Sequence, residues 1–483
     1  MRGYLMTDIR NRLAWGMSAA ALAAVAVLLS AVPAAAAPFG TAIEVPGTAA
    51  LNSGAAVVRS LSCPAPGDCS AGGSYTDNSG DDLPFVVGQT NGTWGIAIEV
   101  PGFAALPGAP VSGVVESVSC SSPGNCAAVG HYSTSARFSY AFAVTQTGGT
   151  WGRVIVVPGT AAAALLPGEP GSRAAVSCVP GHAGDCAVVG GFDDSSGHYQ
   201  AFVADQTGGM WGQAVEVPGF AALNAGGWGW ADHVSCPAPG GCTLGGSYFN
   251  SHHHPVPFVA REQNGTWGTA RAVRGITALG IGGYAGSVGG LSCTSPGNCS
   301  AAGLYGAHPE VYVTTEKNGI WSAAEPMPGL AALARVGSDV FSLSCTSAGN
   351  CAAGGYYFDA QHHSQAFVIS QSGGTWGQAL QVPGSAALNK GDASVYSVSC
   401  ASAGNCVAGG YYASPKAQHD AFTASENGGK WQQMRQVPGT PALSTGDYAQ
   451  VMTVGCARAG TCSVGGFYKD GTGHIQAFVD SQS

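Results

Sequence analysis

The sequence predicts an all-β fold, an eight-bladed β-propeller in which each blade is a four-stranded antiparallel sheet. Three observations support this prediction: a composition poorly suited to long helices, eight repeats with a period of 52 to 58 residues, and a last repeat that lacks its final strand. A period of this length is typical of propellers and solenoids. The N-terminal strand is expected to complete the eighth blade and close the ring.

The composition favours closely packed strands and tight turns. Of 483 residues, 75 are Gly without a collagen-like period, 45% are hydrophobic and 9% are aromatic, so a core can form. Charged residues make up only 9% of the chain and the formal net charge is −9. A nucleic-acid partner is therefore disfavoured.

Residues 1–37 have the pattern of an export signal. Arg2, Arg10 and Arg12 precede an apolar run over residues 17–32, and small residues follow up to Ala37, where we expect cleavage. A membrane anchor is the alternative, but the run is short for a spanning helix of ~20 residues. We therefore expect a secreted protein, detached from the membrane, with residues 38–483 as a single propeller domain.

Paired cysteines mark the repeats. Sixteen Cys form eight close pairs: Cys63/Cys69, Cys120/Cys126, Cys178/Cys186, Cys236/Cys242, Cys293/Cys299, Cys345/Cys351, Cys400/Cys406 and Cys456/Cys462. In an exported chain, each pair is expected to form a disulfide that joins the first strand of a blade to the second. A zinc site is the alternative, but a spacing of five or seven residues without a second adjacent pair is poor for zinc. No cofactor or metal is expected.

Aromatic residues and a Pro-Gly pair recur between the Cys pairs. A strand ending in Gly and an aromatic residue follows each second Cys. An aromatic residue then precedes a Trp by nine residues in seven copies: Phe85/Trp94, Phe142/Trp151, Phe202/Trp211, Phe258/Trp267, Tyr312/Trp321, Phe367/Trp376 and Phe422/Trp431. Pro-Gly follows each Trp after seven residues, except that Arg274 replaces the Pro after Trp267. We expect these Trp side chains to pack between blades.

One repeat shows all four strands. Residues 395–400, 406–412, 421–426 and 431–437 are expected to be strands, because turn residues such as Ala403-Gly404-Asn405 separate them. Four-stranded meanders repeated radially form a propeller.

The two ends of the chain indicate how the ring closes. The last repeat reaches Phe478 and stops at Ser483 without a fourth strand. Phe39 precedes Pro46-Gly47 by the seven residues that elsewhere separate Trp from Pro-Gly. The N-terminal strand is therefore expected to supply the missing strand, which would leave no open sheet edge.

The repeats resemble two known propeller groups. The order Gly-Gly-aromatic, aromatic, Trp, Pro in residues 354–383 is similar to the kelch motif. Residues 370–376, Ser-Gln-Ser-Gly-Gly-Thr-Trp, resemble the Asp-box of sialidase-type BNR repeats, although the Asp itself is absent and the aromatic-to-Trp interval is longer than in kelch repeats. Both resemblances imply a propeller over the mature chain, and neither implies an activity.

Candidate binding residues lie where the repeats differ. Between the second and third strands, three blades share an Asp-to-His interval of four residues: Asp194/His198, Asp359/His363 and Asp470/His474. Asn250/His254 and Asp77/Asp81 are variants of this pattern. The pairs are explained either as turn caps with an exposed Asp–His contact or as a local cation or ligand site.

A second candidate is the connection that leads into the fourth blade, which holds Trp228, Trp230 and His233. Its two extra Trp could stack on a sugar or pack over the central opening.

Enzymatic activity requires a convergent set of groups. Glu116 and Asp232, each four residues before a first-strand Cys, could form a glycosidase pair at the centre of the ring. A sialidase-like site would need an Arg cluster, and the ten Arg after residue 37 occupy no repeated position. We favour a secreted, monomeric binding or scaffold module for an extracellular glycan or protein. A glycan-active enzyme is the alternative.

Overall fold

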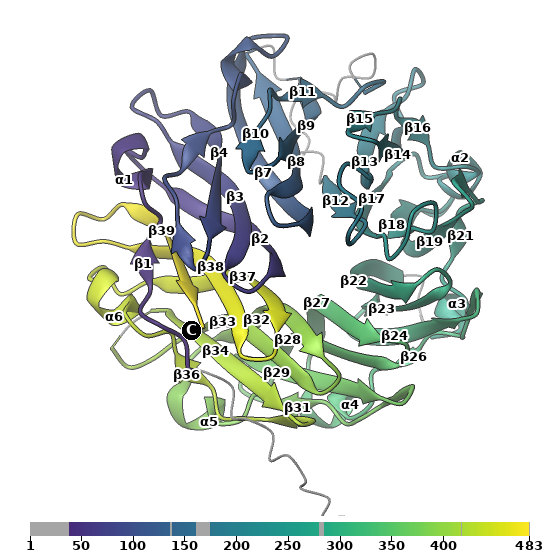
Figure 1. The fold of residues 1–483 in the computed structure, drawn as a ribbon. Helices are drawn as coiled ribbons and strands as arrows, with labels where there is room; N and C mark the ends of the chain where they lie inside the picture. The colour runs from purple at the N-terminus through teal and green to yellow at the C-terminus, as the bar shows by residue number, and fades with distance from the viewer. Residues whose placement is uncertain (1–37, 136–137, 161–173, 280–284, 417, 483) are drawn as a thin grey trace, which may run out of the picture. The chain divides into compact units, whose positions relative to one another are not determined.

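The computed structural model describes residues 38–135, 138–160, 174–279, 285–416 and 418–482. These residues form eight antiparallel sheets, which are the blades of a propeller ring, as predicted (Figure 1). The predicted signal peptide lies outside the described residues. Among the described helices, none is long and apolar enough to cross a bilayer.

Each blade runs from an inner first strand to an outer fourth strand. The first strands are β2 (Ala56–Ala65), β7 (Pro110–Ser122), β12 (Ala175–Cys178), β17 (Gly229–Ser235), β22 (Ala285–Ser295), β27 (Ser338–Ser347), β32 (Ala393–Ser402) and β37 (Ala449–Arg458). The second strands are β3 (Asp68–Thr76), β8 (Asn125–Thr134), β13 (Cys186–Asp193), β18 (Thr243–Phe249), β23 (Asn298–Tyr305), β28 (Asn350–Phe358), β33 (Asn405–Tyr412) and β38 (Thr461–Lys469). The third strands are β4 (Asp82–Thr90), β9 (Ser139–Thr147), β14 (Tyr199–Thr207), β19 (Pro255–Gln263), β24 (Glu310–Lys317), β29 (Ser364–Ser372), β34 (Asp420–Asn427) and β39 (Ile475–Ser481). We number the blades 1 to 8 in this order.

The fourth strand is split into two short pieces, where the sequence predicted one continuous run. In blades 1 to 7 the pieces are β5 (Thr93–Trp94) and β6 (Ile98–Glu99), β10 (Thr150–Trp151) and β11 (Ile155–Val156), β15 (Met210–Trp211) and β16 (Val215–Glu216), β20 (Thr266–Trp267) and β21 (Arg271–Ala272), β25 (Ile320–Trp321) and β26 (Glu325–Pro326), β30 (Thr375–Trp376) and β31 (Leu380–Gln381), and β35 (Lys430–Trp431) and β36 (Arg435–Gln436). The fourth strand is split because a backbone N–H between its two pieces donates a hydrogen bond to the connection from the preceding blade. In blade 7, Met434 N donates to the carbonyl of Pro383 at 2.8 Å.

Short helical turns lie in seven of the connections between blades; most of the connection from blade 2 to blade 3 lies outside the described residues. They are α1 (Thr48–Leu51), η1 (Phe103–Ala105), α2 (Phe220–Leu223), α3 (Ile276–Leu279), α4 (Leu330–Leu333), α5 (Ser385–Leu388) and α6 (Thr440–Leu443). A Gly in the left-handed region precedes each of these turns, as at Gly47 with φ 90°, and a Pro stands before that Gly except at Arg274-Gly275. The repeated Pro-Gly is thus a turn requirement.

The N-terminal strand β1 (Ile43–Glu44) closes the ring. It pairs with β39, beside which it lies in Figure 1, and Phe39 bridges to Gln482 as Trp94 pairs with Gln89 in blade 1. The Tyr468 hydroxyl also donates to Glu44 at 2.9 Å. The predicted split blade is therefore confirmed.

All eight disulfides have the predicted pairing, and no described cysteine is free. Each joins the first and second strands of one blade close to the turn between them, and the second cysteine of every pair is buried. The pairs are Cys63 with Cys69, Cys120 with Cys126, Cys178 with Cys186, Cys236 with Cys242, Cys293 with Cys299, Cys345 with Cys351, Cys400 with Cys406, and Cys456 with Cys462. Their sulfur atoms are therefore bonded to each other, which leaves the alternative of a zinc site without thiolate ligands.

The repeated Trp side chains lie between blades. The Trp267 indole N–H donates to Asp205 of the preceding blade at 3.0 Å, and that of Trp431 donates to Ser370 of the preceding blade at 2.9 Å. These hydrogen bonds cross the seam between neighbouring blades.

Serine hydroxyls connect the first strands around the ring. Ser62 Oγ accepts a hydrogen bond from Cys120 N at 3.0 Å, and Ser119 Oγ accepts one from Cys178 N at 2.9 Å. The same bond recurs from Cys236, Cys293, Cys345, Cys400 and Cys456 to a Ser of the preceding blade. These bonds satisfy N–H groups on the inner edge of the sheets, which no further strand covers.

Removal of residues 38–47 tests the closure. We expect the truncated protein to melt at a lower temperature and to associate, because β39 would expose unpaired backbone groups. Calorimetry and light scattering measure both effects. An unchanged melting temperature with a monomeric product would contradict the split-blade closure.

Asp480 gives the closure a pH dependence. This buried carboxyl lies beneath the N-terminal strand; burial raises its pKa to about 7, against the lowering effect of backbone N–H bonds from Ser481 and Gly40. Since the unfolded value is about 3.9, the folded state holds its proton more tightly, and stability falls as pH rises from about 4 to 7. This loss in the free energy of unfolding is on the order of 4 kcal/mol, and we expect it to be absent from Asp480→Asn. Equal pH profiles of the two proteins in urea unfolding would refute this assignment.

Candidate functional site

The first strand of the blades contains a β-bulge. The register shifts by one residue in seven of the eight first strands, in blade 6 between Val340 and Ser342. The residue so inserted stands four positions before the first-strand Cys: Arg59, Glu116, Asp232, Gly289, Phe341, Tyr396 and Met452. A bulge re-aims the inserted side chain, and this position differs in every blade.

A second position lies next to the bulge. It is the residue that follows the paired Gly on the second strand, and in three blades it contacts the inserted residue of the same blade. His131 Nδ1 is 3.2 Å from Glu116 Oε1, and the rings of Phe341 and Tyr356 have centroids 5.6 Å apart. Tyr396 and Tyr411 are likewise 5.5 Å apart.

In blades 6 to 8, five side chains at these two positions form a continuous run of rings together with His419 and Tyr448, and we call this run the aromatic belt. Its members in order are Tyr356, Phe341, Tyr396, Tyr411, His419, Tyr448 and Phe467. Their successive centroid distances are 5.6, 5.5, 5.5, 4.1, 4.4 and 5.8 Å. The belt therefore crosses three adjacent blades, whose first strands β27, β32 and β37 are consecutive in the ring (Figure 1).

The belt is partly open to solvent. Phe341 is 38% exposed and the other six rings are half-buried. The amide of Gln450 donates to His419 Nδ1 and, at 3.2 Å, to the Tyr448 hydroxyl. Polar groups thus border a surface made of ring faces.

The belt rings are uncharged near neutral pH. Burial raises the pKa of the Tyr396 hydroxyl, and the neighbouring Tyr411 adds to the effect. Burial also lowers the pKa of His419, although Asp392 opposes this shift. A neutral ligand therefore meets no buried charge on the belt itself.

The two carboxylates proposed as a glycosidase pair are each held by their own neighbours. Glu116 Oε2 accepts a hydrogen bond from Ala174 N at 2.7 Å, while Oε1 faces His131. Asp232 Oδ2 accepts the Trp230 indole N–H at 3.1 Å, and Oδ1 lies 3.7 Å from His233 Nε2. They stand on blades 2 and 4, with blade 3 between them.

Trp228 and Trp230 are half-buried and engaged. Trp228 packs on Tyr199 with centroids 4.9 Å apart, and the two residues form a parallel bridge. His419 and Tyr448 form the same bridge and ring contact between blades 7 and 8. Two seams therefore have a ring pair where the chain enters a blade, and of these two only blade 4 uses Trp.

The Asp–His turns owe their common spacing to the carboxylate. Asp194, Asp359 and Asp470 each accept the backbone N–H of the His four residues later at 3.0 to 3.1 Å. Each also accepts the side-chain amide of a Gln six residues later. The first explanation, a turn cap, therefore accounts for the recurring interval.

The turns are held by the hydrogen bond from the His backbone N–H to the Asp carboxylate, and the His side chains themselves are exposed. His198 Nδ1 lies 3.9 Å from Asp194, and the His198 side chain is 54% exposed. His363 and His474 are exposed as well, and each gives the Asp of its turn a backbone N–H. The structure thus assigns His363 a place in a capped turn, where the sequence suggested a ligand site as one of two explanations.

The third His of the 252–254 run lies in a similar turn. Asn250 Oδ1 accepts the backbone N–H groups of His252 and His254, whose rings are 6.2 Å apart. Among the described residues, no three His, Cys, Asp or Glu side chains group as metal ligands.

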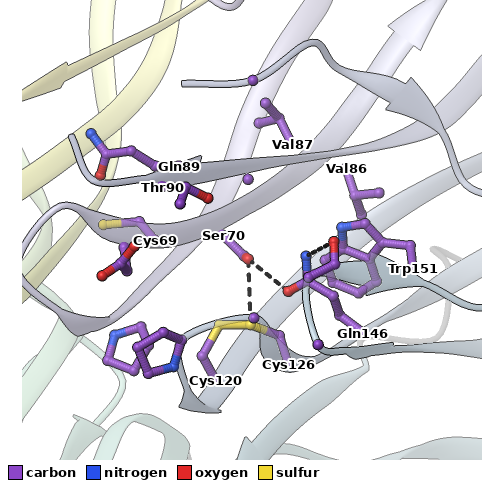
Figure 2. A pocket seen from close by; sticks show the side chains of 18 of the residues that line it. Cys69, Ser70, Val86, Val87, Gln89, Thr90, Cys120, Cys126, Gln146 and Trp151 are labelled. Atoms are coloured by element: carbon purple, nitrogen blue, oxygen red, sulfur yellow. Dashed lines mark hydrogen bonds between the residues drawn. A yellow bond between two sulfur atoms is a disulfide. The ribbon is translucent and has the colours of Figure 1, made fainter. Parts of the chain in front are cut away.

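Pockets also open between blades at the end of the strands that lies away from the aromatic belt, near the disulfides. Figure 2 shows the one between blades 1 and 2, of ≈ 490 Å³, where Ser70 donates to Gln146 at 3.2 Å and Trp151 lies beside it. Gly88 lines this pocket and supplies no side chain. Similar pockets lie between blades 4 and 5 and between blades 6 and 7.

Sequence reasoning missed the belt, although a signal was present. The position four residues before the first-strand Cys drew attention to Glu116 and Asp232, and the same position holds Phe341 and Tyr396.

Comparisons with known proteins give only distant likenesses. No family model matches the chain. No curated protein matches it either. Among solved structures, it is similar to a protein of unknown function from Dyadobacter fermentans DSM 18053, with 11% identity over 76% of this chain and 94% of that chain and a TM-score of 0.41. The Hadza microbial sialidase Hz136 has 13% identity over 83% and 73%, with a TM-score of 0.38. The fucose-specific lectin from Aleuria aurantia has 10% identity over 75% and 89%, with a TM-score of 0.35.

Asp470 and His474 separate the two explanations of the Asp–His turns. Although burial opposes it, hydrogen bonds from Gln476, Thr472 and the backbone lower the pKa of Asp470 to about 2. The contribution of Asp470 to the stability of the fold is therefore complete above the pKa of about 3.9 that it has in the unfolded chain, and it is lost as pH falls towards 2. We expect Asp470→Ala to lower the melting temperature at pH 7 by about 1 to 2 °C, and His474→Ala to leave it unchanged. A larger effect of His474→Ala, or a rise in melting temperature with calcium or zinc that either change abolishes, would favour a ligand site.

Proposed function

We propose that this protein is a secreted binding module whose ligand is a carbohydrate held on the aromatic belt. The observation that supports this proposal most strongly is the belt itself: seven rings in unbroken contact, with Phe341 38% exposed. No comparable run crosses the described first strands of blades 1 to 4.

A purely structural role does not account for the belt. The hydrophobic clusters lie between neighbouring blades, as where Val368 of blade 6 packs in one cluster with Val395 and Phe422 of blade 7, and the belt rings lie outside these clusters. A packing device needed by the fold would recur in all eight blades. The belt instead uses positions that hold Arg59, Glu116 and Gly289 elsewhere.

The chemistry of the belt fits a neutral sugar chain. Aromatic faces bind the apolar faces of sugar rings, and polar side chains at the border fix their hydroxyl groups. Tyr356, Tyr396, Tyr411 and Tyr448 combine both properties in one side chain. The belt is one ring wide and three blades long, which favours an elongated ligand over a folded protein, whose interface buries about 800 Å² per partner.

The remaining features favour a stable module outside the cell. Eight disulfides are typical of an oxidising compartment, and the pattern of residues 1–37 supports export. We propose a monomer without membrane attachment. Since Glu116 and Asp232 are held by their own neighbours, binding is favoured over hydrolysis.

A polysaccharide array probed with residues 38–483 tests the proposal. We expect saturable binding of at least one neutral polysaccharide without release of reducing ends. Phe341→Ala and Tyr396→Ala should each weaken binding at least tenfold, because central aromatic contacts are worth about 2 kcal/mol or more.

Phe192→Ala is the matched control. Phe192 occupies the position of Tyr356 and Tyr411 in blade 3, outside the belt, so its replacement should leave the affinity unchanged. Binding that survives both belt changes would place the ligand elsewhere. Hydrolysis of a bound polysaccharide would favour the enzyme, and binding of proteins only would replace the carbohydrate in the proposal.

A further inference from the structure

Blade 4 has arginine at three positions of the repeat, and at two of them no other blade has arginine. Arg261 stands where the other blades have Gly88, Thr145, Asp205, Thr315, Ser370, Ser425 and Ser481. Arg271 stands where most have an aliphatic residue, such as Ile98 or Leu380. Arg274 replaces the Pro that follows the Trp in every other blade.

The fold brings these three arginines to one pocket. They line a cavity of ≈ 400 Å³ between blades 4 and 5, together with Trp321, Ile320 and the buried Glu316. Arg274 keeps the backbone role of the Pro it replaces. Its carbonyl accepts Ala324 N at 2.7 Å, as that of Pro101 accepts Val154 N at 2.9 Å.

Arg261 is fixed by its surroundings. Its Nη1 lies 3.4 Å from Glu316 Oε1, and its side chain is 24% exposed. The guanidinium also covers Gly297 and Gly319, where a Cβ would come within 2.7 and 2.3 Å of Nη1. A fixed guanidinium loses less freedom when it binds a ligand.

Arg271 and Arg274 have no such partner. Both are exposed, and within the described part of the chain neither forms an ion pair. The whole chain has a net charge of −9, yet three of the ten arginines after residue 37 meet here. The pocket is therefore a cationic place on an acidic protein.

The neighbouring pockets show what is particular to this one. Between blades 1 and 2 the same places hold Gly88 and Ile98, and between blades 6 and 7 they hold Ser370 and Leu380. A hollow between blades is thus common to three seams. Of these three seams, only the one between blades 4 and 5 has arginines in its lining and more basic than acidic side chains; the pocket between blades 6 and 7 has Lys430 together with Glu426.

We propose that this pocket binds an oxyanion, that is, a carboxylate, sulfate or phosphate group on a small organic ligand. Arginine forks match such groups through paired, charge-assisted hydrogen bonds. Trp321 and Ile320 supply an apolar wall for the organic part of the ligand. The site is separate from the aromatic belt, which lies towards the other end of the strands and takes a neutral ligand.

Calorimetric titration with sodium sulfate, sodium phosphate and glucuronate tests the proposal, with acetamide as the neutral control because a neutral sugar could bind the aromatic belt. We expect saturable binding of at least one anion, no binding of acetamide, and weaker anion binding as sodium chloride is raised. Tightest binding of glucuronate would indicate a sugar acid, whereas tighter binding of sulfate or phosphate would indicate those groups.

Two variants restore the residues that other blades carry. Arg271→Ile and Arg274→Pro should each weaken binding at least tenfold without lowering the melting temperature; Arg271→Gln serves if one of them does not fold. The matched control is Arg435→Ile, because Arg435 occupies the place of Arg271 in blade 7 without the other two arginines. The proposal is overturned if no anion binds saturably, if the two variants bind as the wild type does, or if Arg435→Ile weakens binding equally.

Discussion

The fold depends on close contact between a bulged first strand and the paired Gly of the second strand. A Cβ on the second Gly would lie 1.8 to 2.0 Å from a first-strand carbonyl oxygen, as at Gly73, Gly355 and Gly410. A Cβ on the first Gly would lie 2.6 Å from a Val methyl of the next blade, both at Gly409 and at Gly465, where the ring closes. A larger residue at the second Gly would therefore push the two strands apart, whereas the first position holds Val129 in blade 2 and Ala302 in blade 5.

The same contact determines where function can vary. The bulge that brings the carbonyl over the second Gly also inserts one side chain per blade at the inner strand. Disulfides and Ser hydroxyl bonds fix the backbone around it, so this side chain can change without loss of the fold. Blades 6 and 7 use it for Phe341 and Tyr396, whereas blades 2 and 4 use it for acids. The outer strand of blade 4 likewise keeps a backbone hydrogen bond while its side chain changes, because the carbonyl of Arg274 accepts the same bond as that of the Pro in other blades.

The sequence predicts the blades, the disulfides and the closure because each depends on a local spacing that recurs eight times. Phe39 could be placed in the Trp position from one seven-residue interval. The belt was missed although Phe341 and Tyr396 share a position before the first-strand Cys, because strict alternation along a strand assigns the wrong face to any residue beyond a bulge. The belt also joins Tyr411, His419 and Tyr448 from three separate segments. For His198, His363 and His474 the spacing left a turn cap and a ligand site open, and the hydrogen bonds show the cap, since the Asp before each accepts the backbone N–H four residues on.

Hydrogen exchange on the complex with a polysaccharide selected from the array tests most directly whether divergent inner-strand positions form the binding surface. The belt predicts slower exchange over residues 338–345, 393–400 and 444–452, with blades 1 to 4 unchanged. Protection confined to the first strands of blades 1 to 4, or to the hairpin turns at the opposite end of the blades, would contradict it.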